Sequence, residues 1–333
     1  MPISAALARD YAAAVTRDRA DYFQCYLADQ PEYLVPERLC ALDDKRPAGP
    51  LTVSRNAWLA WRENVPSSIA NCYPLPEMFL PSVDLAWVDD AVTGMQLPFW
   101  SGPWFRGKLE GLSPGQAVPE MATYHAAALL AAGVLERPGG TARRAAEWND
   151  IVRRAASGFA KDGFAAMPAL IHRFHLGSLR RYYRRLLRTG GMTLGDNCSP
   201  NRYVVYQESV AQFFHRQIAH VVGAVAGMPV KPTFVYSVSY TGGTNLEVHT
   251  DRAQCEYAVS LLVDYTPEPL EQSPWPLQLN GPNGTRKIWQ ALGDAVLYRG
   301  TRIPHWRDRL AASATSTSLL FYYVNENFTG SLA

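Results

Sequence analysis

The chain has 333 residues and is close to charge balance, with 32 lysines and arginines against 30 aspartates and glutamates and a formal net charge of +2. This balance argues against a dominant nucleic-acid or membrane-surface footprint, and no apolar run approaches the length of a transmembrane helix. A chain of this length can bury a substantial core in one large domain or in two. We therefore expect a globular protein without a nucleic-acid or membrane partner, and its oligomeric state stays open.

The first half of the chain predicts helical and irregular structure. Residues 5–27 are expected to be helical, and residues 30–112, rich in proline and tryptophan, to form an irregular layer packed by aromatic side chains. A helix is expected to begin at Ser113, a typical N-cap residue followed by proline, and to run to about residue 135. Another helix is expected over residues 141–159, ahead of the region where the pattern changes.

The second half alternates short apolar runs with turn residues, a pattern typical of an all-β barrel or jelly roll. Two amphipathic helices are expected before most of the strands, over 179–187, with a solvated arginine-rich face, and over 210–225, ending near Gly227. Strands are expected over 163–170, 234–240, 246–249, 257–265, 277–279, 286–289, 295–298 and 318–324.

His249 and Asp251 stand two residues apart at the end of an expected strand, and His305 follows later in the chain. Residues two apart on a strand point to the same side, so His249 and Asp251 can reach one ion. Two imidazoles and one carboxylate hold Fe(II) on one face and leave other positions open. We therefore predict that these three residues are both the metal ligands and the catalytic centre. The alternative is a polar turn with a histidine at a barrel mouth.

The order of these motifs resembles the catalytic core of the Fe(II)/2-oxoglutarate-dependent dioxygenases, in the prolyl-4-hydroxylase-like or phytanoyl-hydroxylase-like branch. The resemblance covers roughly residues 161–330 and implies an α+β protein, a double-stranded β-helix flanked by helices, with Fe(II), 2-oxoglutarate and O₂ as cofactor and co-substrates. The motifs that carry it are Ser239-Tyr240-Thr241-Gly242-Gly243, His249-Thr250-Asp251, Gly293-Asp294-Ala295-Val296-Leu297 and His305.

The resemblance also implies the reaction and the domain organisation. We expect hydroxylation, or a related C–H oxidation, of a small-molecule or amino-acid-derived metabolite, as in biosynthetic tailoring. Asp251 favours hydroxylation over halogenation, because related halogenases lack this carboxylate. Residues 161–333 are expected to form the oxygenase domain, and residues 1–160 to pack on it and shape its pocket.

The chain departs from the family where 2-oxoglutarate is anchored. The family usually carries a basic residue on the final strand, but residues 314–318 contain none. A bidentate guanidinium suits the distal carboxylate, and Arg307, Arg309 or Arg302 can supply it from a shifted position. The alternative for Arg307 is a surface salt bridge with Asp308 or Glu326.

Other contacts to the co-substrate and substrate are expected from hydroxyl and aromatic side chains. Tyr240 matches a tyrosine that often contacts the co-substrate in this branch, and Thr315 and Thr317 can add hydroxyl groups. Trp289 and Trp306 are candidates to line a substrate pocket, although buried aromatic residues usually just pack.

Three alternatives remain open at this point. The first is an Fe(II) oxidase that uses no 2-oxoglutarate, suggested by the missing terminal-strand arginine. The second is a cupin-like isomerase or hydrolase with another divalent metal, although the extra ligands of cupins are not found in the sequence. The third is a non-catalytic metal-binding barrel protein.

The cysteines bear on the cellular compartment. They are scattered, odd in number and without C-x-x-C spacing, which is typical of reduced thiols. The amino terminus also lacks the apolar core of a signal peptide. Both observations predict a cytoplasmic protein. The five cysteines are Cys25, Cys40, Cys72, Cys198 and Cys255.

Overall fold

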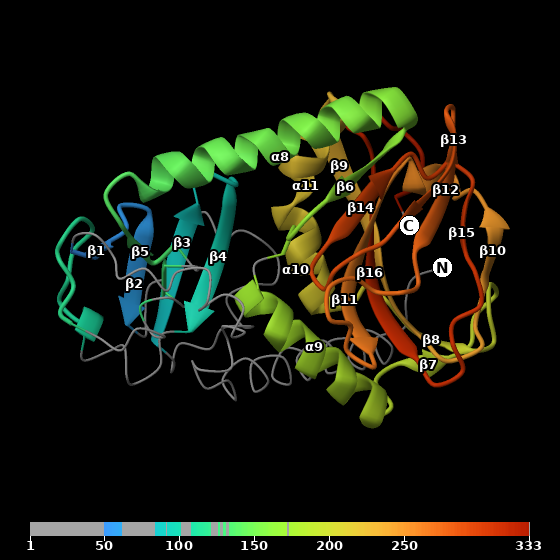
Figure 1. Cartoon of the computed structure of the whole chain (residues 1–333), viewed down its shortest axis with the longest axis horizontal. Helices are drawn as coiled ribbons and strands as arrows, with labels where there is room; N and C mark the ends of the chain where they lie inside the picture. Colours follow the sequence, from blue (N-terminus) through green and yellow to red (C-terminus); the bar gives the residue numbers. More distant parts are fainter. Residues whose placement is uncertain are drawn as a thin grey trace. The chain divides into compact units, whose positions relative to one another are not determined.

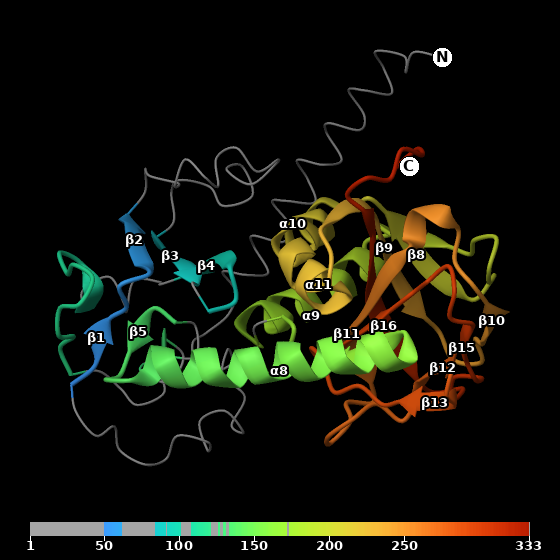
Figure 2. The same ribbon diagram turned by 90° about the horizontal axis from the view of Figure 1, so that it is seen from above.

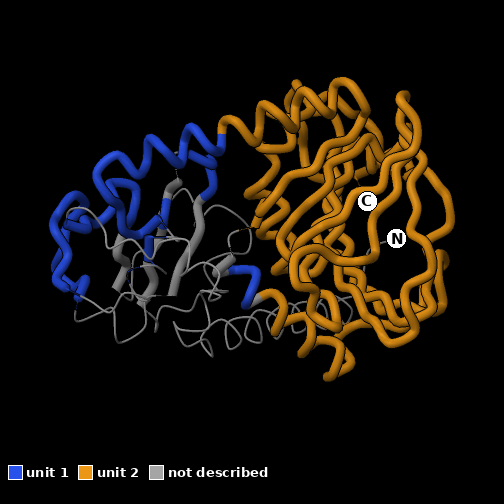
Figure 3. Tube along the Cα trace, viewed as in Figure 1, with its two compact units in different colours: residues 1–148, 173–178 blue, residues 149–172, 179–333 orange. Residues whose placement is uncertain are grey.

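The computed structural model divides the chain into two compact units, coloured separately in Figure 3. Unit 1 comprises residues 1–148 and 173–178, and unit 2 comprises residues 149–172 and 179–333. The helix expected over residues 5–27 lies outside the described residues. The structure describes residues 50–61, 84–90, 92–100, 108–120, 126, 129–130, 133–171 and 173–332.

Unit 1 contains strands where irregular structure was expected. β2 (Ala57–Trp61), β3 (Asp84–Asp90) and β4 (Met95–Trp100) pair in that order as an antiparallel sheet. A short pair joins β1 (Thr52–Val53) to β5 (Leu135–Glu136). The irregular prediction was wrong for these segments because aromatic and other large apolar residues favour strands, a preference that outweighs the nearby prolines.

The helix expected to begin at Ser113 is not formed in residues 112–120, which make turns and one isolated bridge. The backbone N–H of Ser113 donates to Gln116 Oε1 at 2.6 Å, and Gly115 adopts a φ of +86°. A left-handed residue ends helical continuity, so the Ser-Pro-Gly sequence makes a turn here. The later helix is confirmed as α8 (Gly140–Asp162).

Unit 2 is built on two antiparallel sheets, whose strands run from green (β6) to red (β16) in Figure 1. The larger sheet has the order β6-β14-β11-β16-β9-β8-β7, and the smaller has the order β10-β15-β12-β13. The chain crosses repeatedly from one sheet to the other, and its last eight strands have the order of a jelly roll. The strands are β6 (Phe164–Met167), β7 (Thr193–Leu194), β8 (Arg202–Tyr206), β9 (Val230–Tyr240), β10 (Leu246–His249), β11 (Tyr257–Thr266), β12 (Leu277–Gly281), β13 (Gly284–Ile288), β14 (Ala295–Tyr298), β15 (His305–Arg307) and β16 (Thr315–Asn325).

The apolar runs that predict these strands also supply the core between the sheets. β11 is buried along nearly its whole length, as expected for a central strand flanked by β14 and β16. Inward side chains of both sheets meet in one cluster, where burial of each large apolar side chain contributes about 1.5–3 kcal/mol. The buried members of this cluster are Phe164, Phe234, Cys255, Ala258, Leu277, Leu279, Val296, Tyr298, Ile303 and Tyr322.

Helices cover the larger sheet on the side away from the smaller one (Figure 2). α10 (Ser209–Gln217) and α11 (Ala219–Ala226) both contact β9. The sequence predicted one helix here, but the structure breaks it at Ile218, whose ψ is 0°. The end at Gly227 is confirmed, with a left-handed φ of 76° that a glycine adopts without strain.

The buried carboxylate of Glu208 links α10 to another helix, α9 (Arg173–Arg188). It caps α10 by accepting the backbone N–H groups of Val210 and Ala211 at 2.7 and 2.9 Å. Its two oxygens also accept the hydroxyls of Tyr182 and Tyr183, on α9, at 2.8 and 2.7 Å. Four hydrogen bonds therefore compensate the cost of burying the charge at the N-terminus of a helix.

The arginine-rich face of α9 is only partly solvated. Arg180 and Arg184 both bind the nearly buried carboxylate of Asp264, near the end of β11, at 3.0 and 2.5 Å. These ion pairs dock the helix on the larger sheet. Among the described residues, no helix is both long and apolar enough to cross a membrane.

Candidate metal centre

A cavity of about 520 Å³ opens between the two sheets of unit 2. The larger sheet contributes inward residues of β9, β11 and β16, and the smaller sheet contributes β10 and β15. This arrangement brings together residues that are far apart in sequence. The lining residues that matter below are Asp196, Arg202, Phe234, Tyr240, His249, Asp251, Arg252, Tyr298, His305, Arg307, Ser318 and Tyr322.

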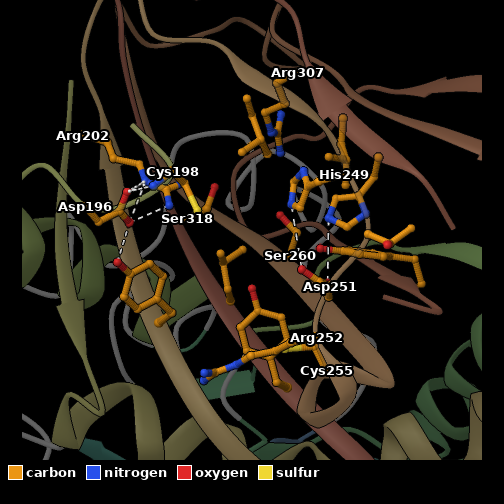
Figure 4. A pocket seen from close by; sticks show the side chains of 18 of the residues that line it. Asp196, Cys198, Arg202, His249, Asp251, Arg252, Cys255, Ser260, Arg307 and Ser318 are labelled. Atoms are coloured by element: carbon orange, nitrogen blue, oxygen red, sulfur yellow. Dashed lines mark hydrogen bonds and ion pairs between the residues drawn. The ribbon is translucent and has the colours of Figure 1, made fainter. Parts of the chain in front are cut away.

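His249, Asp251 and His305 converge on one point of this cavity. His249 ends β10 and pairs directly with His305 at the start of β15, and their ring centroids are 4.2 Å apart. His249 Nε2 lies 3.9 Å from Asp251 Oδ1, and His305 Nε2 lies 3.8 Å from Asp251 Oδ2. One ligand atom from each of the three residues lies within 4.8 Å of the others. Figure 4 shows the His249 ring beside the Asp251 carboxylate.

Hydrogen bonds fix the same tautomer in both imidazoles. His249 Nδ1 contacts the carbonyl oxygen of Glu247 at 2.8 Å, and His305 Nδ1 contacts that of Ile303 at 2.9 Å. A carbonyl oxygen only accepts, so each Nδ1 carries the proton and each Nε2 keeps its lone pair. The lone pairs point toward the same region, and such outer contacts orient histidines that ligate metals.

The electrostatics of the centre fit a cation. Burial raises the pKa of Asp251 to about 7, and Arg252 opposes this shift. Asp251 Oδ2 is buried and has no hydrogen-bond partner among the described residues, a costly state for a carboxylate. Burial and the neighbouring His249 lower the pKa of His305 to about 4, so this imidazole is neutral at pH 7. Two imidazole Nε2 atoms and an uncompensated carboxylate are the donors that a divalent ion needs.

Backbone packing fixes the Asp251 side chain. The N–H of Asp251 donates to the carbonyl of Gly300 at 2.8 Å. A Cβ atom at position 300 would overlap the Asp251 carboxylate and the carbonyl of Cys255. Only glycine leaves room for this approach. On the other side of the centre, the buried ring of Tyr298 lies 4.6 Å from the His305 ring.

Arg307 lies in the cavity two residues after His305, on the same face of β15. It is buried, and its guanidinium donates to the carbonyl of Trp275 at 2.5 Å and to Gln290 Oε1 at 2.9 Å. Burial lowers its pKa from the ordinary arginine value. No carboxylate pairs with it in the described part of the chain, and Asp308 instead lies 3.7 Å from Lys287. The surface salt bridge considered for Arg307 is therefore not formed.

Two hydroxyl groups lie in the same cavity as Arg307. Tyr240, the buried last residue of β9, packs edge-to-face against Trp275 at 5.0 Å. The Trp275 ring in turn lies 4.8 Å from the Arg307 guanidinium. Ser318 on β16 has a buried Oγ without a hydrogen-bond partner among the described residues. A buried cation with neighbouring hydroxyl groups is an arrangement that can bind a carboxylate.

Several residues considered from the sequence lie outside the cavity lining. Trp306 stands between two inward residues of β15, so strand alternation turns it to the other face. Arg309 and Thr315 are exposed, as is about half of Trp289. Arg302 is also exposed.

Sequence reasoning missed two arginines of the cavity. Arg202 on β8 is buried and binds Asp196 with its Nη2 atom 2.6 Å from Oδ2, and Asp196 also accepts the hydroxyl of Tyr236 at 2.5 Å. Arg252 follows Asp251 directly, and its guanidinium lies 4.4 Å from the centre of the Phe234 ring. The signal for Arg252 was its place beside the predicted ligand. Arg202 gave none, because its role depends on the turn that brings Asp196 back to it.

No protein-family model and no curated protein sequence matches the chain. Solved structures do resemble it. The non-heme alpha ketoglutarate dependent epimerase SnoN from nogalamycin biosynthesis is 12% identical with a TM-score of 0.45, covering 53% of this chain and 83% of SnoN. A Pseudomonas putida prolyl-4-hydroxylase is 13% identical with a TM-score of 0.43, covering 53% of this chain and 100% of that one.

HygX from Streptomyces hygroscopicus, solved with nickel and 2-oxoglutarate bound, is 15% identical with a TM-score of 0.42, covering 53% of this chain and 88% of HygX. The proteins found in this way thus include members of the superfamily that the sequence resembles. At these identities and TM-scores their activities are not carried over to this chain, and its chemistry is inferred from its own side chains.

Proposed function

We propose that the chain is a non-haem Fe(II)- and 2-oxoglutarate-dependent oxygenase that oxidises a C–H bond of a small molecule. The observation that carries this proposal is the convergence of His249, Asp251 and His305, with both Nε2 atoms free and one carboxylate oxygen uncompensated. A polar turn with a histidine at a barrel mouth gives no reason for this combination.

His249, Asp251 and His305 would hold Fe(II) on one face and leave its other positions open to the cavity. When bound, iron and 2-oxoglutarate would supply the oxidising chemistry, in which O₂ is consumed, the keto-acid becomes succinate and CO₂, and the C–H bond of the substrate is oxidised. The protein's own part is to hold both imidazoles as Nδ1–H tautomers, to fix the position of the Asp251 carboxyl, and to exclude water. The apolar lining residues Leu246, Leu277 and Leu320 serve the last of these roles.

Arg307 is the proposed anchor for the distal carboxylate of 2-oxoglutarate, with Tyr240 and Ser318 as hydroxyl donors. Arg307 is a buried cation that no carboxylate neutralises among the described residues, whereas Arg202 is already paired with Asp196. The guanidinium comes from β15, and Ser318 on β16 lines the same cavity.

The proposal extends to the organisation of the chain. Residues 161–333 would form the oxygenase domain, and residues 1–160 would help to shape its substrate pocket. Such a pocket suits a small-molecule or amino-acid-derived metabolite.

An anaerobic titration tests the proposal without knowledge of the substrate. Fe(II) is added to metal-free protein, followed by 2-oxoglutarate, and the weak visible charge-transfer band of the chelated keto-acid is recorded. We expect one equivalent of each to bind in the wild type and in the exposed control Arg309→Gln, and no band in Asp251→Ala. Iron binding without keto-acid binding would favour the oxidase, and binding of neither would favour a non-catalytic barrel.

A further inference from the structure

A second arginine of the cavity, Arg252, forms no direct ion pair in the described part of the chain. Arg252 is exposed to the cavity, and no described carboxylate forms an ion pair with it. Its guanidinium is not loose, because it lies 4.4 Å from the ring centre of Phe234, itself a buried residue of the lining. A guanidinium held flat against an aromatic face keeps its N–H donors available at the ring edge.

A count of the charged groups in the cavity leaves Arg252 without a compensating negative charge. Three arginines and two aspartates line the cavity in the described part of the chain. Arg202 is neutralised by Asp196. A divalent ion, Asp251 and Arg307 together carry two positive charges, which match the two carboxylates of 2-oxoglutarate. Arg252, an exposed residue, is then the charged side chain of this lining that neither Asp196 nor this set of charges compensates, so its N–H groups are available to a bound anion.

The position of Arg252 separates its role from that of Arg307. In Figure 4 the two arginines lie at opposite ends of the cavity, with His249 and Asp251 between them. A molecule anchored at Arg252 would therefore approach the metal centre from the side opposite the proposed keto-acid anchor.

The wall beside Arg252 is aromatic. The Phe234 ring lies 4.7 Å from the Tyr322 ring and 5.4 Å from the Tyr206 ring, measured between ring centres, and all three residues line the cavity. The rings are tilted against one another by 35° and 38°, and they give this end of the cavity an apolar wall on which an apolar group packs favourably, chiefly at the exposed Tyr206. The polar end of such a molecule would meet Arg252, and its apolar body would meet this face.

We propose that the substrate is a monoanionic carboxylic acid with an aromatic or apolar body, whose carboxylate pairs with Arg252 and whose body packs on Phe234. This inference rests on the proposed function for the position of the reacting bond. The charge count selects a carboxylate over a phosphate, because a phosphate dianion would leave one negative charge uncompensated. Arg252 is thus a specificity-determining residue for the reaction.

Ligand-observed NMR with matched probes tests the inference. The protein is loaded with Zn(II) and 2-oxoglutarate and titrated with phenylacetate, cinnamate and indole-3-acetate and with their primary amides. We expect the carboxylates to bind about tenfold or more tightly than the amides. Arg252→Gln should abolish this preference, Arg252→Lys should restore part of it, and the exposed control Arg286→Gln should leave it unchanged.

Equal binding of acids and amides, a preference that survives Arg252→Gln, or no binding of any acid would overturn the inference. A second arm separates it from the proposed function. If Zn(II) and 2-oxoglutarate fail to load, the titrations are repeated on the metal-free protein with Arg252→Gln and Arg307→Gln. If acid binding is weakened only in Arg252→Gln, the substrate site is supported and the co-substrate assignment fails. If acid binding does not depend on Arg252, the proposed substrate site is wrong.

Discussion

The Nε2 atom of His305 lies 3.8 Å from Oδ2 of Asp251, and that oxygen has no hydrogen-bond partner among the described residues. The pairing of β10 with β15 creates this relationship, because it sets His305 directly opposite His249. An ion held between these atoms would compensate the buried carboxylate. The following predictions depend on that geometry or on the scaffold that maintains it.

Metal affinity should rise with pH and level off near pH 7. Below its pKa of about 7 the Asp251 carboxyl is protonated in the metal-free protein, so binding must release that proton. We expect the apparent Co(II) affinity to fall about tenfold per pH unit between pH 7 and pH 5.5. Calorimetry across this range measures it. Asp251→Asn should bind far more weakly, and a pH-independent affinity in the wild type would exclude Asp251 as a ligand.

Gly300→Ala should damage the metal centre more than the fold. The added Cβ would overlap the Asp251 carboxylate and the backbone of Cys255, so the ligand must move. Such overpacking typically costs about 1–3 kcal/mol of stability. We expect at least about a tenfold loss of metal affinity, since a displaced carboxylate loses most of one metal bond. Gly140→Ala, a control at the start of α8 with no close contact, should change neither quantity.

Arg307→Ala should weaken 2-oxoglutarate binding with little effect on metal binding. The guanidinium supplies charge-assisted hydrogen bonds, each of which contributes about 1.5–3 kcal/mol, or roughly 10- to 100-fold in affinity. The dissociation constant of 2-oxoglutarate for the Fe(II) protein measures this directly. Arg307→Lys should be intermediate, because it keeps the charge without the fork of donors. An unchanged constant would move the anchor elsewhere.

Glu208→Gln should destabilise unit 2 without altering the metal centre. The amide cannot accept all four hydrogen bonds that the carboxylate accepts from Tyr182, Tyr183, Val210 and Ala211. A buried network that loses its charge and one acceptor typically costs about 3 kcal/mol. Urea unfolding compares this variant with Glu271→Gln on an exposed loop, which should lie within about 0.5 kcal/mol of the wild type.

His215 should make the protein sensitive to acid. It is buried between α10 and β16, where its Nε2 contacts the carbonyl of Tyr322 at 2.8 Å and its ring stacks on Phe321. Burial lowers its pKa from 6.5 to about 3. Since the unfolded chain binds this proton more readily, stability present above pH 6.5 is lost as pH falls toward 3, by up to about 1.4 kcal/mol per pH unit.

The variant His215→Gln isolates this effect, because it keeps a side-chain donor near Tyr322 but does not titrate. The comparison is needed because Asp251 acts in the opposite direction in the metal-free protein. Its folded pKa is raised to about 7, so protonation as pH falls toward 4 favours the folded state. The wild type should therefore lose stability between pH 6.5 and 4 relative to His215→Gln. Parallel curves would contradict the assignment of His215.

Most of the jelly roll could be predicted from the sequence because its strands carry their own signals. Residues 257–265 are a nearly unbroken apolar run, and the turn at 280–284 separates two matching strands of one hairpin. The three-residue strand β15 could not be predicted, since it exists only through pairing with β10 and β12. If β15 had been predicted, the alternation of side chains along a strand would have placed Arg307 on the cavity side with His305, and Trp306 on the opposite side.

The parts of the cavity that were missed depend on tertiary contacts. Arg202 lines the cavity, and its charge is neutralised by Asp196, which the turn after β7 brings close to it. Nothing in the local sequence pattern shows this contact. The sheet of β2, β3 and β4 was obscured by prolines between its strands. The residues whose types carry chemistry, two histidines and an aspartate, could be selected from the sequence because few other structures require that combination.

X-ray absorption at the iron edge of the anaerobic Fe(II) protein tests the central claim most directly. The structure predicts one iron per chain with two imidazole ligands and otherwise oxygen donors, reduced to one imidazole in both His249→Ala and His305→Ala. A spectrum with sulfur ligands, with no imidazole, or with two imidazoles that persist in both variants would contradict the centre described above.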